Sequence, residues 1–230
     1  MTEEVHPEEM PTTEMRMGRV TLEPGIDIMI RPIQPDDKGL LARGFGQLSS
    51  QARYQRFFSE VESLTEKDLV YLTEVDHVNH EALIAIDPDN GDLVGVARYV
   101  RIDPGNRAEV AVIVADEWQG RGLGTVLLQG LVERSRTAGI NEFLALVLSS
   151  NEDARHLFEN LIPGKATTST GDPGQVEVLI GLPERGRFAD SRLAHIFRST
   201  ATGNLKFGPT RWLQGRTLKG RQQRHDEPED

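Results

Sequence analysis

The sequence of 230 residues contains no cysteine. This absence excludes disulfide bonds, thiolate metal ligands and a cysteine nucleophile. No apolar run approaches the roughly 18 residues that span a bilayer, and the opening segment MTEEVHPEEM lacks the apolar stretch of a secretory signal. We therefore expect a soluble, cytoplasmic protein that makes no membrane contact.

Acidic residues outnumber basic ones, but the two signs are unevenly distributed. The formal net charge is −10, yet residues 185–225 contain ten Lys and Arg and one acidic residue, Asp190. A basic segment beside an acidic body is typical of a solvated tail, an intramolecular clamp or a contact with an anionic partner. Aromatic residues interleave the segment, which leaves nucleic-acid binding open, although the overall acidity argues against such a partner.

Composition divides the chain into three parts. Residues 1–25 are rich in Glu and poor in apolar residues, so we expect an acidic, disordered N-terminal segment. Residues 26–183 alternate strand and helix patterns and are expected to form one domain. Residues 184–230 form a basic C-terminal tail without clear periodicity, apart from a helical pattern at about 188–200.

The hydrophobic pattern of the central part predicts its elements. A strand at 26–31 precedes helices at 36–47, 50–58 and 65–74, with Ser49 and Thr65 as N-caps. Strands at 81–87, 93–102 and 108–115 follow, and their tight connections indicate an antiparallel meander. A helix at 123–138, a strand at 143–148, a helix at 151–161 and a strand at 176–182 complete the domain. This order predicts a mixed α/β (α+β) fold, with a largely antiparallel, twisted sheet and helices on both faces.

A glycine-rich turn separates the last strand of the meander from the next helix. It reads Gln119-Gly120-Arg121-Gly122-Leu123-Gly124. Glycine lets the backbone turn sharply and approach a ligand closely. The first N–H groups of a helix have no intrahelical partners, and they carry about half a positive charge. The turn therefore predicts a site that holds a pyrophosphate on main-chain N–H groups, with Arg121 adding charge.

Two other phosphate-binding motifs do not fit this turn. A P-loop requires Lys-Ser/Thr after its last glycine, and none follows here. A dinucleotide-binding turn requires Gly-x-Gly-x-x-Gly, whereas the glycines stand at 120, 122 and 124. The flanking strands also show an antiparallel pattern, so neither motif is supported.

The turn resembles the Gln/Arg-x-x-Gly-x-Gly/Ala motif of the GNAT superfamily of N-acetyltransferases. Further stretches resemble the acetyltransferase domain of bacterial protein lysine acetyltransferases: RPI at 31–33, RYQRFF at 53–58, VDHVNHEAL at 75–83 and AEVA at 108–111. The resemblance covers about residues 26–182. It implies a GNAT fold whose fourth and fifth strands splay apart, and it implies acetyl-CoA as the co-substrate, with no metal.

The resemblance also implies roles for single residues. Pantetheine is expected between the splayed strands, the pyrophosphate on the turn, and a contact from the residue that opens the next helix. The residues expected to bind the cofactor are Val112, Ile113, Val114, Gln119, Gly120, Arg121, Gly122, Leu123, Gly124, Thr125 and Asn151. Glu109 is expected to be the general base, since a strand carboxylate can take a proton from the attacking amine directly or through one water.

One departure from the family concerns the proton donor. Many relatives carry a tyrosine on the helix after Asn151, where it protonates the departing thiolate. Here that helix reads NEDARHLFENL and contains no tyrosine. Phe158 cannot donate a proton, so His156 or water is left for this role.

Two histidines precede the second strand. His77 and His80 stand close to Asp76 and Glu81, but His-x-x-His without a third ligand is a weak indication of a metal site. We expect a structural or substrate-cleft role for them and no metal. Tyr54 and its neighbours are expected to serve helix packing, with contact to the substrate as the alternative.

The expected reaction is transfer of acetyl from acetyl-CoA to an amine, with a protein lysine as the first choice of acceptor. A small amine is the enzymatic alternative. A non-catalytic acyl-CoA-binding module that signals through the basic tail is the alternative from another class. The acidic body would attract a cationic acceptor of either kind.

Overall fold

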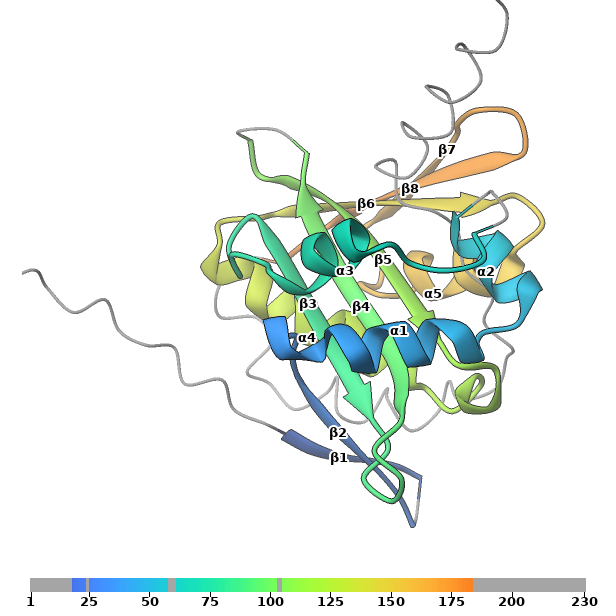
Figure 1. Ribbon diagram of the computed structural model, residues 1–230. Helices are drawn as coiled ribbons and strands as arrows, with labels where there is room; N and C mark the ends of the chain where they lie inside the picture. Colours follow the sequence, from blue (N-terminus) through green and yellow to red (C-terminus); the bar gives the residue numbers. More distant parts are fainter. Residues whose placement is uncertain (1–17, 24, 58–60, 103–104, 184–230) are drawn as a thin grey trace, which may run out of the picture.

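A single eight-stranded sheet organises the computed structural model, which describes residues 18–23, 25–57, 61–102 and 105–183. The strand order is β1-β2-β3-β4-β5-β6-β8-β7 (Figure 1). The strands are β1 Gly18–Glu23, β2 Ile26–Pro32, β3 His80–Ile86, β4 Leu93–Arg101, β5 Arg107–Val114, β6 Glu142–Leu148, β7 Ala166–Thr170 and β8 Gln175–Gly181. Every neighbouring pair is antiparallel except β5 and β6, which are parallel. The predicted meander is confirmed by β3, β4 and β5.

The helices lie close to their predicted positions. They are α1 Lys38–Gln47, α2 Ser50–Phe57, α3 Glu66–Thr73, α4 Leu123–Thr137 and α5 Glu152–Glu159, with short 3-10 turns η1 Pro35–Asp37 and η2 Asp116–Trp118. Both predicted N-caps are present: Ala52 N donates to Ser49 Oγ at 3.1 Å, and Asp68 N donates to Thr65 Oγ1 at 3.3 Å. No helix in these described ranges is long and apolar enough to cross a membrane.

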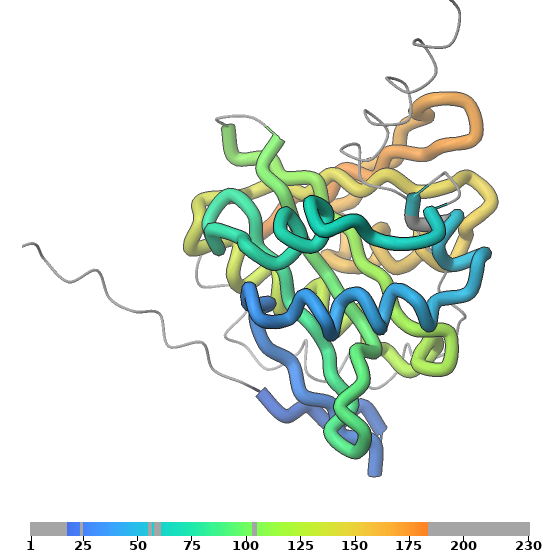
Figure 2. Tube along the Cα trace, viewed as in Figure 1, coloured from blue at the N-terminus to red at the C-terminus, as the bar shows by residue number. Residues whose placement is uncertain are grey.

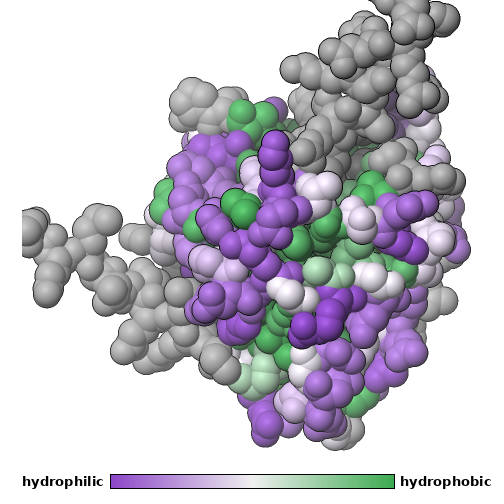
Figure 3. Space-filling model, in the orientation of Figure 1, coloured by the Kyte–Doolittle hydropathy of each residue, from purple (hydrophilic) through white to green (hydrophobic). Residues whose placement is uncertain are grey.

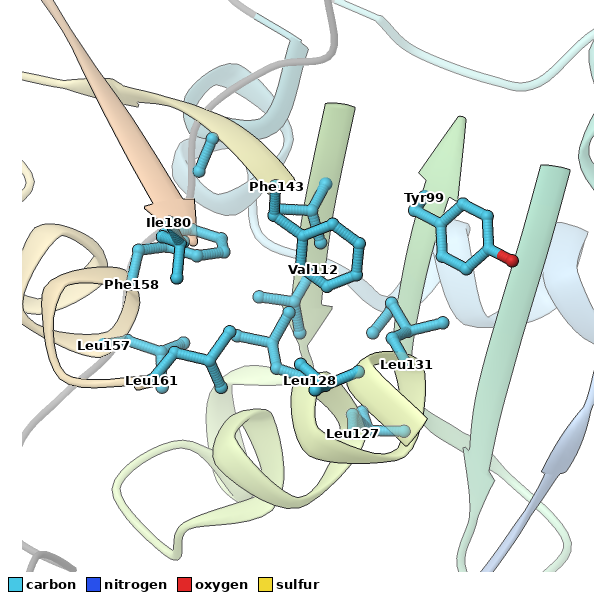
Figure 4. Packing of buried hydrophobic residues seen from close by; sticks show 14 of the residues in the cluster. Tyr99, Val112, Leu127, Leu128, Leu131, Phe143, Leu157, Phe158, Leu161 and Ile180 are labelled. Carbon is cyan, nitrogen blue, oxygen red and sulfur yellow. The ribbon is translucent and has the colours of Figure 1, made fainter. Parts of the chain in front are cut away.

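The sheet separates two layers of helices. Helices α1 and α3 cover one face of β3 and β4, and α4 crosses the other face (Figures 1 and 2). The main core fills the α4 and α5 side (Figure 4). Its labelled members are Tyr99, Val112, Leu127, Leu128, Leu131, Phe143, Leu157, Phe158, Leu161 and Ile180. A smaller cluster that includes Ile33, Leu41 and Ile84 packs beneath α1 and α3. The expected fold class, a mixed and largely antiparallel sheet with helices on both faces, is confirmed.

Two strands lie where the sequence pattern predicts none. Residues 18–23, which we expected to be disordered, form β1 and pair with β2 across the turn at Gly25 (φ 84°). Strand β7, with the sequence ATTST, pairs with β8 although it carries no apolar alternation. Both are edge strands fixed by a neighbouring strand rather than by a buried face of their own. Residues 1–17 and the tail, including the helix expected at 188–200, lie outside the described residues.

Candidate active site

Strands β5 and β6 pair only where they begin. The register joins Arg107 to Glu142, Ala108 to Phe143 and Glu109 to Leu144, and no later residues of the two strands are paired. Beyond this point β6 continues along β8, and β5 continues along β4. A gap therefore opens between β5 and β6 immediately after Glu109, which is the splay that the resemblance implies.

The main chain of β5 directs the groups of alternate residues into this gap, where none of them pairs with β6. Arg107 O accepts from Ile102 N, and Ala115 N donates to Val94 O, so odd-numbered residues direct their main-chain groups toward β4. Because directions alternate along a strand, the main-chain groups of Val110, Val112 and Val114 point toward β6. The side chains alternate as well: Val112 and Val114 are buried in the core, while Ile113 lines the opposite face. Of the three residues expected to hold pantetheine, Val112 and Val114 therefore direct main-chain groups into the gap, and Ile113 does not.

The glycine turn leads directly into α4. Gly120 and Gly122 adopt φ of 74° and 78°, conformations that favour glycine. Gly122 is the N-cap of α4 and makes no side-chain cap hydrogen bond. Within the described residues, the main-chain N–H groups of residues 120–125 donate no hydrogen bond. The first hydrogen bond of the helix runs from Val126 N to Gly122 O. A Cβ built on Gly122 meets nothing within 4 Å. The helix end is therefore open to an anion.

The side chains of the turn serve mainly to hold it. Gln119 Nε2 donates to Val114 O at 3.1 Å and to Asp116 Oδ1 at 3.3 Å, which ties the turn to the end of β5. The Arg121 guanidinium lies 5.3 Å from the centre of the Trp118 ring. Leu123 is buried in the core at 1% exposure, so only its main chain can face a ligand. Gly124 is buried, and Thr125 is half-buried, in the first turn of α4.

Asn151 combines a cap with an unused donor. Its Oδ1 accepts from Ala154 N at 3.0 Å and caps α5. The residue is 3% exposed, and its buried Nδ2 has no hydrogen-bond partner among the residues that the structure describes. Buried donors without a partner are rare in folded proteins. This amide, the main-chain groups that β5 directs into the gap and the open end of α4 together fit an extended ligand that carries a pyrophosphate beyond a long arm, as acetyl-CoA does.

Glu109 lies on the other face of the sheet from α4. Its side chain is 7% exposed and lines a cavity of about 360 Å³ between the sheet and helices α1 and α3. Figure 3 shows the apolar surface that lies between these two helices. The cavity walls are mostly apolar, and the polar side chains on them are Tyr71, Arg98, Arg101 and Glu109. The Glu109 carboxylate therefore lies in a mostly apolar cavity, at the point where β5 and β6 separate.

A buried arginine stands beside Glu109. Arg98 is 5% exposed, donates from Nη1 to His80 Nε2 at 2.8 Å and from Nη2 to Leu72 O at 3.2 Å. Burial, followed by the Arg98 charge, lowers the pKa of His80 to about 3. His80 is thus neutral and accepts through Nε2. Burial raises the pKa of Tyr71, and the Glu109 charge adds to that rise, so this phenol stays protonated.

The remaining sequence candidates are engaged in local structure. Asp76 Oδ1 accepts from the main-chain N of Val78, Asn79 and His80, and these bonds help to lower the Asp76 pKa to about 2 against the effect of burial. His77 Nδ1 lies 2.8 Å from Glu81 Oε1. In the part of the chain that the structure describes, no three His, Asp or Glu side chains gather closely enough to hold a metal ion.

The α5 candidates and Tyr54 lie away from the cavity. His156 is exposed on α5, and Phe158 packs in the core at 2% exposure. Neither lines the cavity, and Tyr54 is half exposed on α2, at 50%.

Sequence reasoning missed the polar floor of the cavity. Arg98 and Tyr71 were not among the predicted site residues, although Arg98 interrupts the apolar run of β4 at a position that a strand buries. A charged residue inside such a run is the signal that could have identified it.

The chain is similar to known acetyltransferases in both sequence and structure. The model of the acetyltransferase (GNAT) family matches residues 49–161. An acetyltransferase of Pseudomonas aeruginosa is 29% identical over 139 residues, which are 60% of this chain and 75% of that protein. Acetyltransferase Pat of Mycolicibacterium smegmatis is 35% identical over 133 residues, 57% of this chain and 40% of Pat, so the matched part spans less than half of that relative.

A solved structure extends the match to the whole domain. The crystal structure of the GNAT domain of S. lividans PAT aligns with a TM-score of 0.68 and 31% identity, covering 76% of this chain and 100% of that domain. The residues matched by the family model, 49–161, include β5, β6 and the glycine turn described above. The splay, the open end of α4 and these matches lead to one conclusion: the chain belongs to the GNAT family of acetyltransferases, whose co-substrate is acetyl-CoA.

Proposed function

We propose that this protein acetylates a primary amine, that the acceptor is the lysine side chain of a protein, and that Glu109 is the general base. The observation that carries the proposal is the position of Glu109. This residue is the last on β5 to pair with β6, and its side chain lines the cavity on the face opposite to α4. The gap for the co-substrate and the cavity for the acceptor therefore meet at one carboxylate.

The chain offers main-chain groups for most of the co-substrate contacts. The N–H groups of residues 120–125 would hold the pyrophosphate, and the main chain of Val112 and Val114 would hold the pantetheine arm. Asn151 Nδ2, which is buried and finds no partner in the described part of the chain, would donate to the same arm. When bound, acetyl-CoA supplies the activated acyl carbon.

Glu109 handles the proton of the acceptor. An ammonium ion must lose a proton before its nitrogen can form a bond to the acyl carbon, and Glu109 accepts it directly or through one water. As the C–N bond forms the C–S bond breaks, and the leaving thiolate takes up one proton. Since α5 carries no tyrosine, His156 or water supplies that proton.

The cavity suits an amine on an aliphatic arm. Lysine combines an apolar stem with a charged head, which matches mostly apolar walls that carry a single carboxylate besides Tyr71, Arg98 and Arg101. A small apolar amine is a second candidate, because about 360 Å³ falls within the range of roughly 300–1,000 Å³ that small-molecule pockets occupy.

The experiment is a comparison of the protein with Glu109→Gln. Release of CoA thiol is measured with acetyl-CoA and a lysine-containing peptide, and acetyl-CoA affinity is measured by calorimetry. Loss of the base should lower kcat by about 10²–10⁴-fold, while the Kd for acetyl-CoA stays the same. Glu133→Gln, which removes an exposed carboxylate on α4, is the matched control and should leave both values unchanged.

The acceptor panel separates the candidates. Turnover with peptides but not with small amines supports the lysine acceptor, and the reverse supports the small amine. Tight acetyl-CoA binding with no turnover on any amine, unaffected by Glu109→Gln, would overturn the proposal in favour of a non-catalytic binding module.

A further inference from the structure

Building on the role proposed for Glu109, we propose that Arg98 is a positioning residue that fixes the Glu109 carboxylate and counters its charge, and that His80 holds Arg98 in place. None of the sequence motifs includes Arg98. The inference rests on the register of the sheet, on the contacts of the guanidinium and on the charges that surround the cavity.

The register places the two side chains on one face as diagonal neighbours. Val100 lies opposite Glu109, and Arg98 lies opposite Ala111, in the antiparallel pair of β4 and β5. Residues 98, 100, 109 and 111 all line the cavity. Diagonal positions of this kind lie about 7–8 Å apart, which long side chains readily span. Both side chains are almost fully buried, at 5% and 7% exposure.

Two hydrogen bonds hold the guanidinium. His80, one strand further along the sheet, accepts from Nη1, and the carbonyl of Leu72 at the end of α3 accepts from Nη2. His80 is itself fixed, because its main-chain N donates to Asp76 Oδ1 at 2.8 Å and its ring packs 4.9 Å from the Tyr71 ring. These contacts restrict the orientation of Arg98 and leave the guanidinium on the cavity floor.

Most of the described residues around Glu109 carry no charge. Tyr71 on α3 is a neutral phenol, Leu144 on β6 is apolar, and α1 contributes apolar residues such as Leu41. Arg101 also lines the cavity, but its side chain donates to Asn79 Oδ1 and to the carbonyls of Gly105 and Ala138.

Arg98 is therefore the cation placed to balance Glu109. Of the described residues that line the cavity, Glu109 is the only acidic one. A buried cation is costly unless a counter-charge lies near it, and the same holds for a buried carboxylate. The pair would keep Glu109 ionised, and ready to accept a proton, at a burial that would otherwise favour the neutral acid.

The test is the pH profile of kcat/KM for the full chain and for Arg98→Met, Arg98→Lys and Arg101→Met. Removing the Arg98 charge should move the acid limb of the profile upward by about 1–3 pH units. Arg98→Lys should keep the limb near its original position, because the charge remains. Arg101→Met is the matched control, since it removes a neighbouring cation bound elsewhere, and it should leave the limb unchanged.

The outcomes are separable from those of the proposed function. If urea titrations show that Arg98→Met does not fold, Arg98→Gln replaces it in the test, because glutamine is also neutral but can still donate hydrogen bonds. An acid limb that stays in place in the neutral variants, with the rate lowered equally at every pH, would overturn the inference while leaving Glu109 as the base. Full activity of Glu109→Gln would instead overturn the proposed function.

Discussion

Glu81 on β3 and Arg134 on α4 form an ion pair between the sheet and the helix, and the Glu81 side chain is completely buried. The same carboxylate lies 2.8 Å from His77 Nδ1 and accepts from Ala82 N at 2.9 Å. One buried acid thus joins the loop before β3 to α4, the helix whose first turn we propose as the anion site. Glu81 faces α4, whereas His80, its neighbour in sequence, contacts Arg98 and Tyr71 on the other face of the sheet.

Removal of the Glu81 charge should destabilise the fold. Glu81→Gln leaves Arg134 without its counter-charge, and breaking a buried pair in this way costs about 3 kcal/mol. Urea unfolding of the variant measures this loss. Glu142→Gln breaks the exposed pair with Arg107 and should cost no more than about 1 kcal/mol. Equal effects of the two substitutions would contradict the account of Glu81.

Two substitutions at Gly122 distinguish the effect of backbone strain from the effect of a negative charge at the proposed anion site. Gly122→Ala should cost about 1 kcal/mol of stability, because φ is 78° while the space around the new Cβ is open. Gly122→Asp suffers the same strain but places a carboxylate where the pyrophosphate is expected, so acetyl-CoA affinity should fall at least about tenfold further. Calorimetric titration of both variants checks this. Equal affinities would mean that the ligand phosphates lie elsewhere.

Two substitutions at Asn151 should distinguish its role as a helix cap from its role in ligand binding. Asn151→Ser keeps an oxygen that can cap α5 but removes the buried Nδ2, so stability should change little. Acetyl-CoA affinity should fall by about 2–10-fold, as expected for one lost hydrogen bond. Asn151→Ala loses the cap as well and should unfold about 1 kcal/mol more easily. Unchanged affinity in Asn151→Ser would show that Nδ2 does not reach the ligand.

His80 should make stability depend on pH. Its pKa is near 6.5 when unfolded and about 3 when folded, so between these values the unfolded state binds more protons. The contribution of His80 is complete above pH 6.5 and should be lost progressively as the pH falls toward 3. Unfolding free energies at a series of pH values should show a shallower decline for His80→Gln than for the parent chain. Parallel curves would mean that His80 is not held neutral.

The sequence predicts the parts of this fold that have strong local signals. Apolar runs identified β3, β4, β5 and β6, and cap residues such as Thr65 located the helices. Strands β1 and β7 were missed because their stability comes from pairing with a neighbouring strand, which is a tertiary effect that five or six residues do not encode.

The site was predictable in part for the same reason. The glycine turn could be recognised in the sequence because Gly120 and Gly122 adopt conformations that few other residues accept. The role proposed for Arg98, by contrast, depends on the register of β4 against β5 and on a contact with His80, which lies 18 residues away along the chain. Such cross-strand relations carry no local pattern.

A crystal structure of the protein grown with acetyl-CoA tests the central claim most directly. We predict the pyrophosphate on the main-chain N–H groups of residues 120–125, the pantetheine arm in the gap between β5 and β6, and the acetyl carbon next to the Glu109 end of the cavity. Acetyl-CoA bound outside this gap, or a closed β5–β6 gap filled by side chains, would contradict the account.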